Sequence, residues 1–441
     1  MNMPNPAALS PSHLQRARLP RWLLPATWPQ QGSQPALADL HLAQGRVRRV
    51  IPHQPEMKID GGGWDLNGAL VLPGLVDAHT HLDKAFTLAR MGTVQPGLLG
   101  AIEAMMVDRC GWTEADVRDR ASRALQWAFE AGVTHLRTHC DWWEADTQPP
   151  AWSVLRELAH DWADRLTLER VSLIPLHLFA DRSTALALAA SVARGGPGAL
   201  LGGFVHTTNW NPQALRHLFE AAQQHSLNVD LHVDEELNPT ACGLATTAAI
   251  LQDTRFDGHV VCGHTCALAM QDEATALATL DAVAAVPITL VTLPITNLLL
   301  QDAITGRTPR QRGITLVKEA RERDIPVLVA SDNVQDPFCP VGSFDPLEAL
   351  AAGVMAAQLD APFDRWSDAL CRSDWLRRGP AKLPLQVGDS ADLLVFTAAD
   401  VWGFPSRSQP RVVLRGGRVA SGVPPEHWLV EQNTKEAACP P

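Results

Sequence analysis

From about residue 70 onward, short apolar runs alternate with longer segments of helical periodicity, and this alternation leaves few possible folds. Segments between the runs, such as residues 214–226, carry apolar residues three and four positions apart, which is typical of an amphipathic helix. Eight strands that alternate with helices predict an α/β fold, a (β/α)8 barrel of the TIM type. The expected strands lie at residues 70–81, 132–139, 170–179, 199–207, 227–233, 259–265, 287–294 and 325–333.

The regions outside this alternation predict a second, smaller unit. Residues 1–20 are rich in proline and predict a loose tail. Residues 21–70 contain short apolar alternations, and short strand-like stretches with turn residues return in residues 385–441. A chain of 441 residues is too long for one ordinary core. We therefore expect the barrel at residues 71–384 and a small β-sandwich domain built from both chain ends.

Charge and hydropathy argue against two classes of partner. The chain has 37 Lys and Arg against 48 Asp and Glu, a formal net charge of −11, and no strong basic run, which disfavours nucleic acid. No window approaches the roughly 18 apolar residues of a membrane span. No signal-peptide pattern is present, and the eight cysteines are scattered, so we expect a cytoplasmic protein with reduced thiols. The oligomeric state stays open, with a homo-oligomer as one option.

Two histidines stand one residue apart where the first apolar run ends. In a strand, His79 and His81 of VDAHTHLDK point to the same side, because alternate residues share a face. In a barrel strand that face is the interior, and active sites lie at the carboxyl ends of the strands. Two neutral imidazoles there supply half of a transition-metal site, whereas two packed core histidines would give the same short pattern.

Three further strand ends carry residues of the same chemical kind. The fifth expected strand ends with His232, which Glu235 follows three residues later, while the sixth ends with His264 and the eighth with Asp332. Together these residues favour an active site over chance. Three histidines and one carboxylate leave room for a metal-bound water, whose pKa a divalent metal lowers towards about 7. A carboxylic acid beside that water moves the proton to a leaving nitrogen, and Glu235 is placed for this role.

This ordered set of motifs resembles the amidohydrolase superfamily, and within it the cytosine deaminase clade. The likeness runs from about Leu72 to Val419. It is strongest in NLLLQ at 297–301, RGITLVKE at 312–319 and SDNVQDPFCPVG at 331–342, and is supported by HVDE at 232–235, GHT at 263–265 and GDSADLLVF at 388–396.

The resemblance implies a role for each motif residue. One divalent ion, Fe²⁺ or Zn²⁺, would be bound by His79, His81, His232 and Asp332. Glu235 would move protons to and from a heterocycle, and His264, helped by Asp332, would orient the attacking water. Many members of the superfamily bridge two metals with a carboxylated lysine. The third and fourth expected strands contain no lysine, so we expect a single metal.

The sequence departs from the cytosine deaminase pattern at the expected substrate contacts. Leu178 aligns with a glutamine that reads the pyrimidine amide, and Asn333 stands where the clade has a second aspartate. Phe338 corresponds to an aromatic lid residue. Polar pocket groups set discrimination, so these changes should alter which ring is hydrogen-bonded. Lys84 either contacts an anionic or carbonyl group of the substrate or pairs with Asp83 in a loop.

Other histidines and aromatic residues near the strand ends have two readings. His135, His139 and His206 either line the mouth of the barrel or are packed or capping residues. Trp142 and Trp143 either stack on a planar ring or belong to ordinary barrel packing.

The sequence favours hydrolytic deamination. HTHLDK and SDN also resemble N-isopropylammelide amidohydrolase, a triazine enzyme of the same clade that lacks the glutamate corresponding to Glu235. We therefore expect ammonia release from an amidine-type C–NH2 group of cytosine or a related pyrimidine or triazine. One alternative is the release of an N-alkylamine or the opening of a cyclic amide. The other is a non-catalytic barrel subunit, which would require a lost ligand or acid, and none is missing.

Overall fold

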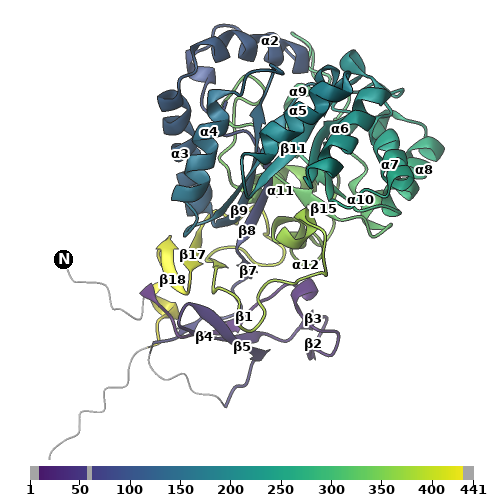
Figure 1. Ribbon diagram of the computed structural model, residues 1–441. Coiled ribbons are helices and arrows are strands. Elements are labelled where there is room, and N and C mark those ends of the chain that lie inside the picture. Colours follow the sequence, from purple (N-terminus) through teal and green to yellow (C-terminus); the bar gives the residue numbers. More distant parts are fainter. Residues whose placement is uncertain (1–8, 57–61, 431–441) are drawn as a thin grey trace, which may run out of the picture.

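The computed structural model describes residues 9–56 and 62–430. Figure 1 shows two parts, a larger one in which helices surround strands and a smaller one made mainly of strands. Within the described residues, no helix is both long and apolar enough to cross a membrane. The cytoplasmic location and the oligomeric state stay predictions.

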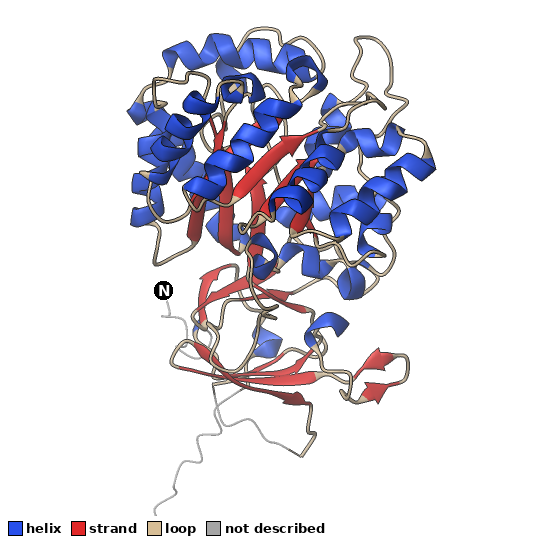
Figure 2. Cartoon of the chain, turned by 45° about the vertical axis from the view of Figure 1, so that its right-hand side comes forward, coloured by secondary structure: helices blue, strands red, loops and turns tan. Residues whose placement is uncertain are grey.

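Eight parallel strands form the barrel, which confirms the predicted fold class (Figure 2). Asp332 follows the last strand and donates its backbone N–H to the carbonyl of His79 at 2.9 Å. A parallel bridge between Thr80 and Asp332 lies beside this bond, so the first and last strands meet. In chain order the strands are β8 (Leu75–Thr80), β9 (Val133–Asp141), β10 (Thr167–Leu173), β11 (Ala199–Val205), β12 (Val229–Val233), β13 (Val260–His264), β14 (Ile288–Thr292) and β15 (Val327–Val329).

Helices surround the strands, as the periodicity predicts (Figure 2). Helix α6 begins with the Asn211 side chain accepting backbone N–H bonds from the first turn and with Pro212 at the first helical position. Its apolar stripe, which includes Leu215, Leu218 and Phe219, is buried. The α-helices are α2 (Leu98–Asp108), α3 (Glu114–Ala131), α4 (Pro150–Asp161), α5 (Arg182–Ala193), α6 (Pro212–Gln224), α7 (Gly243–Thr254), α8 (Glu273–Ala284), α9 (Pro294–Leu300), α10 (Val317–Arg321), α11 (Pro346–Ala356) and α12 (Pro362–Arg365).

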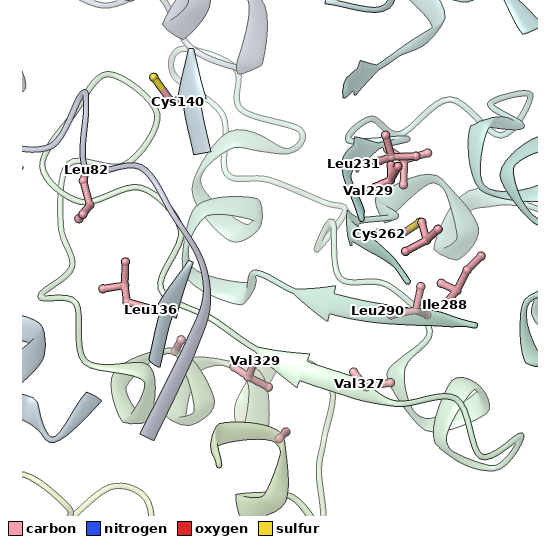
Figure 3. Close-up of a cluster of buried hydrophobic side chains, with 14 of the residues drawn as sticks. Leu82, Leu136, Cys140, Val229, Leu231, Cys262, Ile288, Leu290, Val327 and Val329 are labelled. Atoms are coloured by element: carbon pink, nitrogen blue, oxygen red, sulfur yellow. The ribbon is translucent and has the colours of Figure 1, made fainter. Parts of the chain in front are cut away.

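The strand residues alternate between two hydrophobic clusters. Figure 3 shows part of the larger cluster, in which Cys262 of β13 lies between Val229 and Leu231 of β12 and Ile288 and Leu290 of β14, with Val327 and Val329 of β15 next to β14. A separate smaller cluster holds residues of opposite parity, among them Val291 and Leu328. Because neighbouring strand residues point to opposite faces, the larger cluster lies between strands and helices and the smaller one inside the barrel. His232 lies between Leu231 and Val233 of the larger cluster, so its side chain points into the barrel interior.

Two further four-stranded sheets draw on both ends of the chain. One runs β5 (Arg46–Pro52), β4 (Ala38–Ala43), β1 (His13–Ala17) and β6 (Trp64–Asp65), and the other runs β18 (Arg418–Ser421), β17 (Arg411–Arg415), β16 (Leu393–Phe396) and β7 (Val71–Pro73). A short hairpin joins β2 (Gln30–Gln31) to β3 (Gln34–Pro35). One cluster of buried residues, with Leu14 and Trp64 from the first sheet and Leu393 and Val412 from the second, packs both together. This confirms a small β unit assembled from both chain ends.

Two expectations about the part of the chain before the barrel need correction. The loose tail predicted for residues 1–20 is wrong for β1, because Leu14 and Ala17 are buried in the core of the small sheets. Residues 1–8 lie outside the described part. The first apolar run also divides at Gly74, where β7 leaves the small sheet and β8 enters the barrel. A Cβ at Gly74 would lie 2.3 Å from a methyl group of Thr134, so this crossing point requires glycine.

Candidate metal centre and active site

Three imidazole rings converge at the carboxyl ends of β8 and β12. The Nε2 atom of His232 lies 3.1 Å from Nε2 of His79 and 3.1 Å from Nε2 of His81. All three side chains are buried. The sequence predicted this convergence from the strand alternation, and the structure brings the three rings together.

Asp332, which follows the last barrel strand, adds a carboxylate to the three imidazoles. Its Oδ1 atom lies 3.2 Å from Nε2 of His81 and 3.6 Å from Nε2 of His79. Both carboxylate oxygens are buried and lack a hydrogen-bond partner within the described residues. A buried carboxylate without partners is costly unless a cation or a donor satisfies it.

The donor set fits one divalent metal ion. Two nitrogens bound to the same ion at about 2 Å in a tetrahedral arrangement lie about 3.3 Å apart, close to the separations found here. Burial lowers the pKa of all three imidazoles well below the ordinary value, so they are neutral and have free lone pairs. Three neutral nitrogens and one carboxylate are a donor set that suits Zn²⁺ or Fe²⁺.

The backbone beside the cluster adopts conformations that side chains rarely take. His264 has a φ of 69° and Asp332 a φ of 65°, both in the left-handed region. Such strain is concentrated at functional sites. Gly263 lies against the cluster, and a Cβ there would come within 2.8 Å of Cε1 of His79. Strand β13 therefore approaches the His79 ring so closely that only glycine fits at position 263.

Glu235 and His264 form an acid–base pair next to the cluster. Oε1 of Glu235 lies 3.2 Å from Nδ1 of His264, and the side-chain amide nitrogen of Asn297 lies 3.0 Å from the same ring nitrogen. Burial raises the pKa of the Glu235 carboxyl well above its ordinary value, and the Asp332 charge adds to this effect. Burial also lowers the pKa of His264 to about 3. A protonated carboxyl and a neutral imidazole therefore face each other.

A mostly apolar cavity opens onto these groups. His81, His232, Glu235 and His264 line one part of it. Helix α2 supplies much of the opposite wall through Leu98, Ile102 and Met105, and Trp143, Leu173, Pro175 and Phe204 add to it. Sequence reasoning missed the α2 wall, because its residues look like any other apolar helical positions.

The predicted substrate contacts divide into two groups. Lys84, Asn333 and Phe338 line the cavity. Leu178, expected to contact the substrate, is not among the residues that line it and packs instead against the main hydrophobic core. It lies in a short 3₁₀ helix that spans Leu176–Phe179 and follows Pro175.

The other histidines differ in their positions. His139 is fully buried, with its ring centre 3.9 Å from that of His79, and lies behind the ligand rings. His135 faces Glu169 at 3.1 Å, and His206 stacks on Phe204 and caps a short 3₁₀ turn.

The two adjacent tryptophans also separate. Trp142 is buried in the main core, and Trp143 lines the cavity.

Sequence reasoning also missed two polar residues of the site. Asp141 ends β9 and lines the cavity, and Asn297 in α9 contacts His264. The second strand was expected to end at His139, so Asp141 was not recognised as a strand-end residue. Asn297 belongs to a quoted motif, yet no pattern in the sequence connects it to His264.

The fold is a barrel whose strand ends carry a cluster of histidine and aspartate side chains that could hold a metal ion. The chain belongs to the amidohydrolase family, which matches residues 63–147 and 151–420, and it is thereby a hydrolase that acts on carbon–nitrogen bonds. This confirms the resemblance found in the sequence.

Two curated proteins show where in the family the similarity lies. The chain is 36% identical over 396 residues to a pterin deaminase of Rhizobium rhizogenes strain K84, covering 88% of this chain and 89% of that protein. It is 22% identical over 403 residues to an N-isopropylammelide isopropyl amidohydrolase of Pseudomonas sp. strain ADP, covering 86% of this chain and 93% of that protein.

A solved structure supports the fold. The 5-methylcytosine deaminase of Klebsiella pneumoniae, liganded with 5-fluorocytosine, superposes with a TM-score of 0.77 at 23% identity, covering 94% of this chain and 98% of that chain.

Proposed function

We propose that this protein is a hydrolytic deaminase that replaces the exocyclic amino group of a small nitrogen heterocycle by oxygen from water and releases ammonia. The position of Glu235 carries this proposal. Its carboxyl contacts His264 at 3.2 Å and lines the same cavity as His81 and His232. This contact supports the proposal of a proton donor beside the expected metal ligands, which hydrolysis of a C–NH2 group requires.

His79, His81, His232 and Asp332 would hold the divalent cation. When bound, such a cation lowers the pKa of a water molecule towards about 7, so that hydroxide is available at neutral pH.

The remaining steps belong to residues of this chain. Glu235, kept protonated by burial, donates its proton to the ring nitrogen of the amidine and then passes a proton to the departing amino group. The neutral His264 ring orients the attacking water and stabilises the oxygen as it adds. Asn297 holds that ring in place through its side-chain amide. The balance is one ring amine and one water giving one ring carbonyl and one ammonia.

The cavity walls suit a planar ring. Phe338 and Trp143 supply aromatic surfaces, and Leu98, Ile102 and Met105 supply an aliphatic one. Walls of this kind exclude water from the reacting groups and hold a flat ring by its faces.

We propose the pterin ring as the first substrate to test. The relative named a pterin deaminase is 36% identical over 88% of this chain, against 22% for the relative named an isopropyl amidohydrolase. Cytosine is a weaker candidate, because the 5-methylcytosine deaminase is only 23% identical to this chain and supports the fold alone.

Ammonia release from metal-loaded protein tests the proposal. Pterin, cytosine, isocytosine and an N-isopropylamino triazine would be supplied in parallel, with ammonia and isopropylamine measured separately. We expect one ammonia per ring and no alkylamine. If the protein releases isopropylamine and no ammonia from any of these rings, the deamination proposal is wrong and N-alkylamine release is the reaction.

A further inference from the structure

The cavity wall contains a buried ion pair that the proposed reaction does not use. Nζ of Lys84 donates a hydrogen bond to Oδ1 of Asp141 at 2.8 Å. Lys84 is 3% exposed and Asp141 4% exposed, and both line the cavity that Glu235 and His264 line. Lys84 follows β8 and Asp141 ends β9, and these two strands are paired, so the pair sits at the barrel mouth.

Both members of the pair have hydrogen-bonding groups that their mutual contact leaves unused. Oδ2 of Asp141 is buried and has no hydrogen-bond partner within the described residues. An ammonium group has three donors, and the one hydrogen bond that Lys84 Nζ makes within the described part of the chain goes to Asp141. Leaving such groups unpaired in a buried place costs free energy, so a ligand that satisfies both binds more tightly.

The surroundings fix the orientation of the two groups. The Asp83 carboxylate accepts the backbone N–H of Asp141 at 2.8 Å and holds the end of β9 in place. The Lys84 ammonium lies 4.7 Å from the ring centre of Phe338, over its face. The pair therefore offers one fixed donor and one fixed acceptor beside an aromatic surface.

We infer that the Lys84–Asp141 pair binds the lactam edge of the substrate, meaning a ring N–H next to a ring carbonyl. Lys84 donates to the carbonyl oxygen, and Oδ2 of Asp141 accepts from the ring N–H. This inference rests on the proposed deaminase function and narrows its substrate class to aminoheterocycles that also carry a lactam. Pterin, isocytosine and cytosine have such an edge, and 2-aminopyrimidine does not.

Ring discrimination then depends on Lys84 and Asp141 and not, as the sequence suggested, on the residue at position 178. Leu178 was expected where an amide-reading residue would stand, and it lies outside the cavity. Asp141 and Lys84 supply the missing acceptor and donor from the neighbouring strands. A site built around such hydrogen bonds rejects a ring that lacks them, because its own buried groups are then left unpaired.

Matched substrates test the inference on the unaltered, metal-loaded protein. Pterin and its 4-methoxy analogue have the same amidine, but the methyl ether has no lactam N–H and no carbonyl. We expect kcat/KM for pterin to exceed that for the analogue by at least about 100-fold. Equal values would overturn the inference, while leaving the deaminase proposal intact.

A neutral replacement of the pair tests the residues themselves. In a Lys84→Met/Asp141→Asn variant both charges are removed together, so neither member of the pair is left buried without the other. We expect kcat/KM for pterin to fall about 100-fold and that for the methoxy analogue to change less than about threefold. Equal losses for both rings, with metal content unchanged, would mean that the pair is only structural.

A control variant removes a partly buried ion pair elsewhere in the chain. Arg372 and Asp374, 2.7 Å apart and not among the residues that line the active-site cavity, would be changed in Arg372→Met/Asp374→Asn. This variant should keep the preference for pterin over the methoxy analogue. Loss of the preference here as well would overturn the assignment to Lys84 and Asp141.

Direct binding separates failure of this inference from failure of the proposed reaction. If no ring releases ammonia, deamination is wrong, and the dissociation constants of pterin and the methoxy analogue still test the pair. Binding of pterin at least about 100-fold tighter supports the lactam site. Equal affinities, or no binding of either ring, overturn it.

Discussion

The carboxyl oxygen Oε1 of Glu235 lies 3.2 Å from Nδ1 of His264, within a cavity also lined by two of the expected metal ligands. Burial leaves the first group protonated and the second neutral. A proton donor and a hydrogen-bonding imidazole are thereby held on the same side of the site. The predictions below follow from this arrangement and from the cluster beside it.

Replacing Glu235 by Gln should separate turnover from metal binding. The amide keeps the size of the carboxyl and cannot donate an acidic proton, so we expect kcat to fall about 10²- to 10⁴-fold. Metal content, measured by elemental analysis, should stay at that of the unaltered protein. Full activity in this variant would remove Glu235 from the proton path.

His79→Ala should lower metal content well below one ion per chain, because one of three converging nitrogens is lost. His160→Ala, at an exposed position in α4, is the matched control and should bind metal normally. Unchanged stoichiometry in His79→Ala would contradict the ligand assignment.

Gly263→Ala tests the close approach of β13 to the His79 ring. The added Cβ would lie 2.8 Å from Cε1 of His79, so the ring has to shift. We expect metal affinity to fall about 10- to 100-fold, as when the support of a ligand is disturbed. Gly92→Ala adds a methyl group in open space and should leave affinity unaltered. Equal affinities for both variants would show that the contact is not tight.

Asn297→Ala should reduce kcat about tenfold or more, because the ring of His264 loses the side chain that fixes Nδ1. Metal content should not change, since the Asn297 side chain contacts His264, which is not one of the four expected ligands. Restored turnover in Asn297→Gln would support a positioning role, and an unaffected kcat in Asn297→Ala would exclude one.

Adding metal to chelator-treated protein should raise the unfolding temperature. A ligand that binds only the folded state adds about 2.7 kcal/mol of stability at a concentration 100 times its dissociation constant. Zn²⁺ and Fe²⁺, the latter without oxygen, would be titrated separately, and the metal that also restores activity is the functional one. No rise with either ion would contradict a metal centre at these residues.

The sequence was informative wherever a local rule applied. The two-residue alternation of strands placed His79 and His81 on one face, and the strand-end rule found His232, His264 and Asp332. The barrel fold followed from the alternation of strand and helix patterns. These are regularities of local geometry, and they hold whatever the surrounding residues are.

The remainder depended on long-range packing. Strand β9 continues to Asp141, two residues beyond its expected end, so its last carboxylate was overlooked. A 3₁₀ helix begins at Leu176, and Leu178 within it packs against the main hydrophobic core. The segment around Leu14 forms a strand and not a tail, because Leu14 packs in a core formed by residues distant in the sequence. No local pattern contains this information.

The most direct test of the account compares ammonia release from pterin by metal-loaded protein and by its Glu235→Gln variant. The account predicts one ammonia per pterin for the first, and a loss of at least about 100-fold for the second at equal metal content. Equal rates in the two proteins, or isopropylamine from the alkylated triazine as the one amine released, would contradict it.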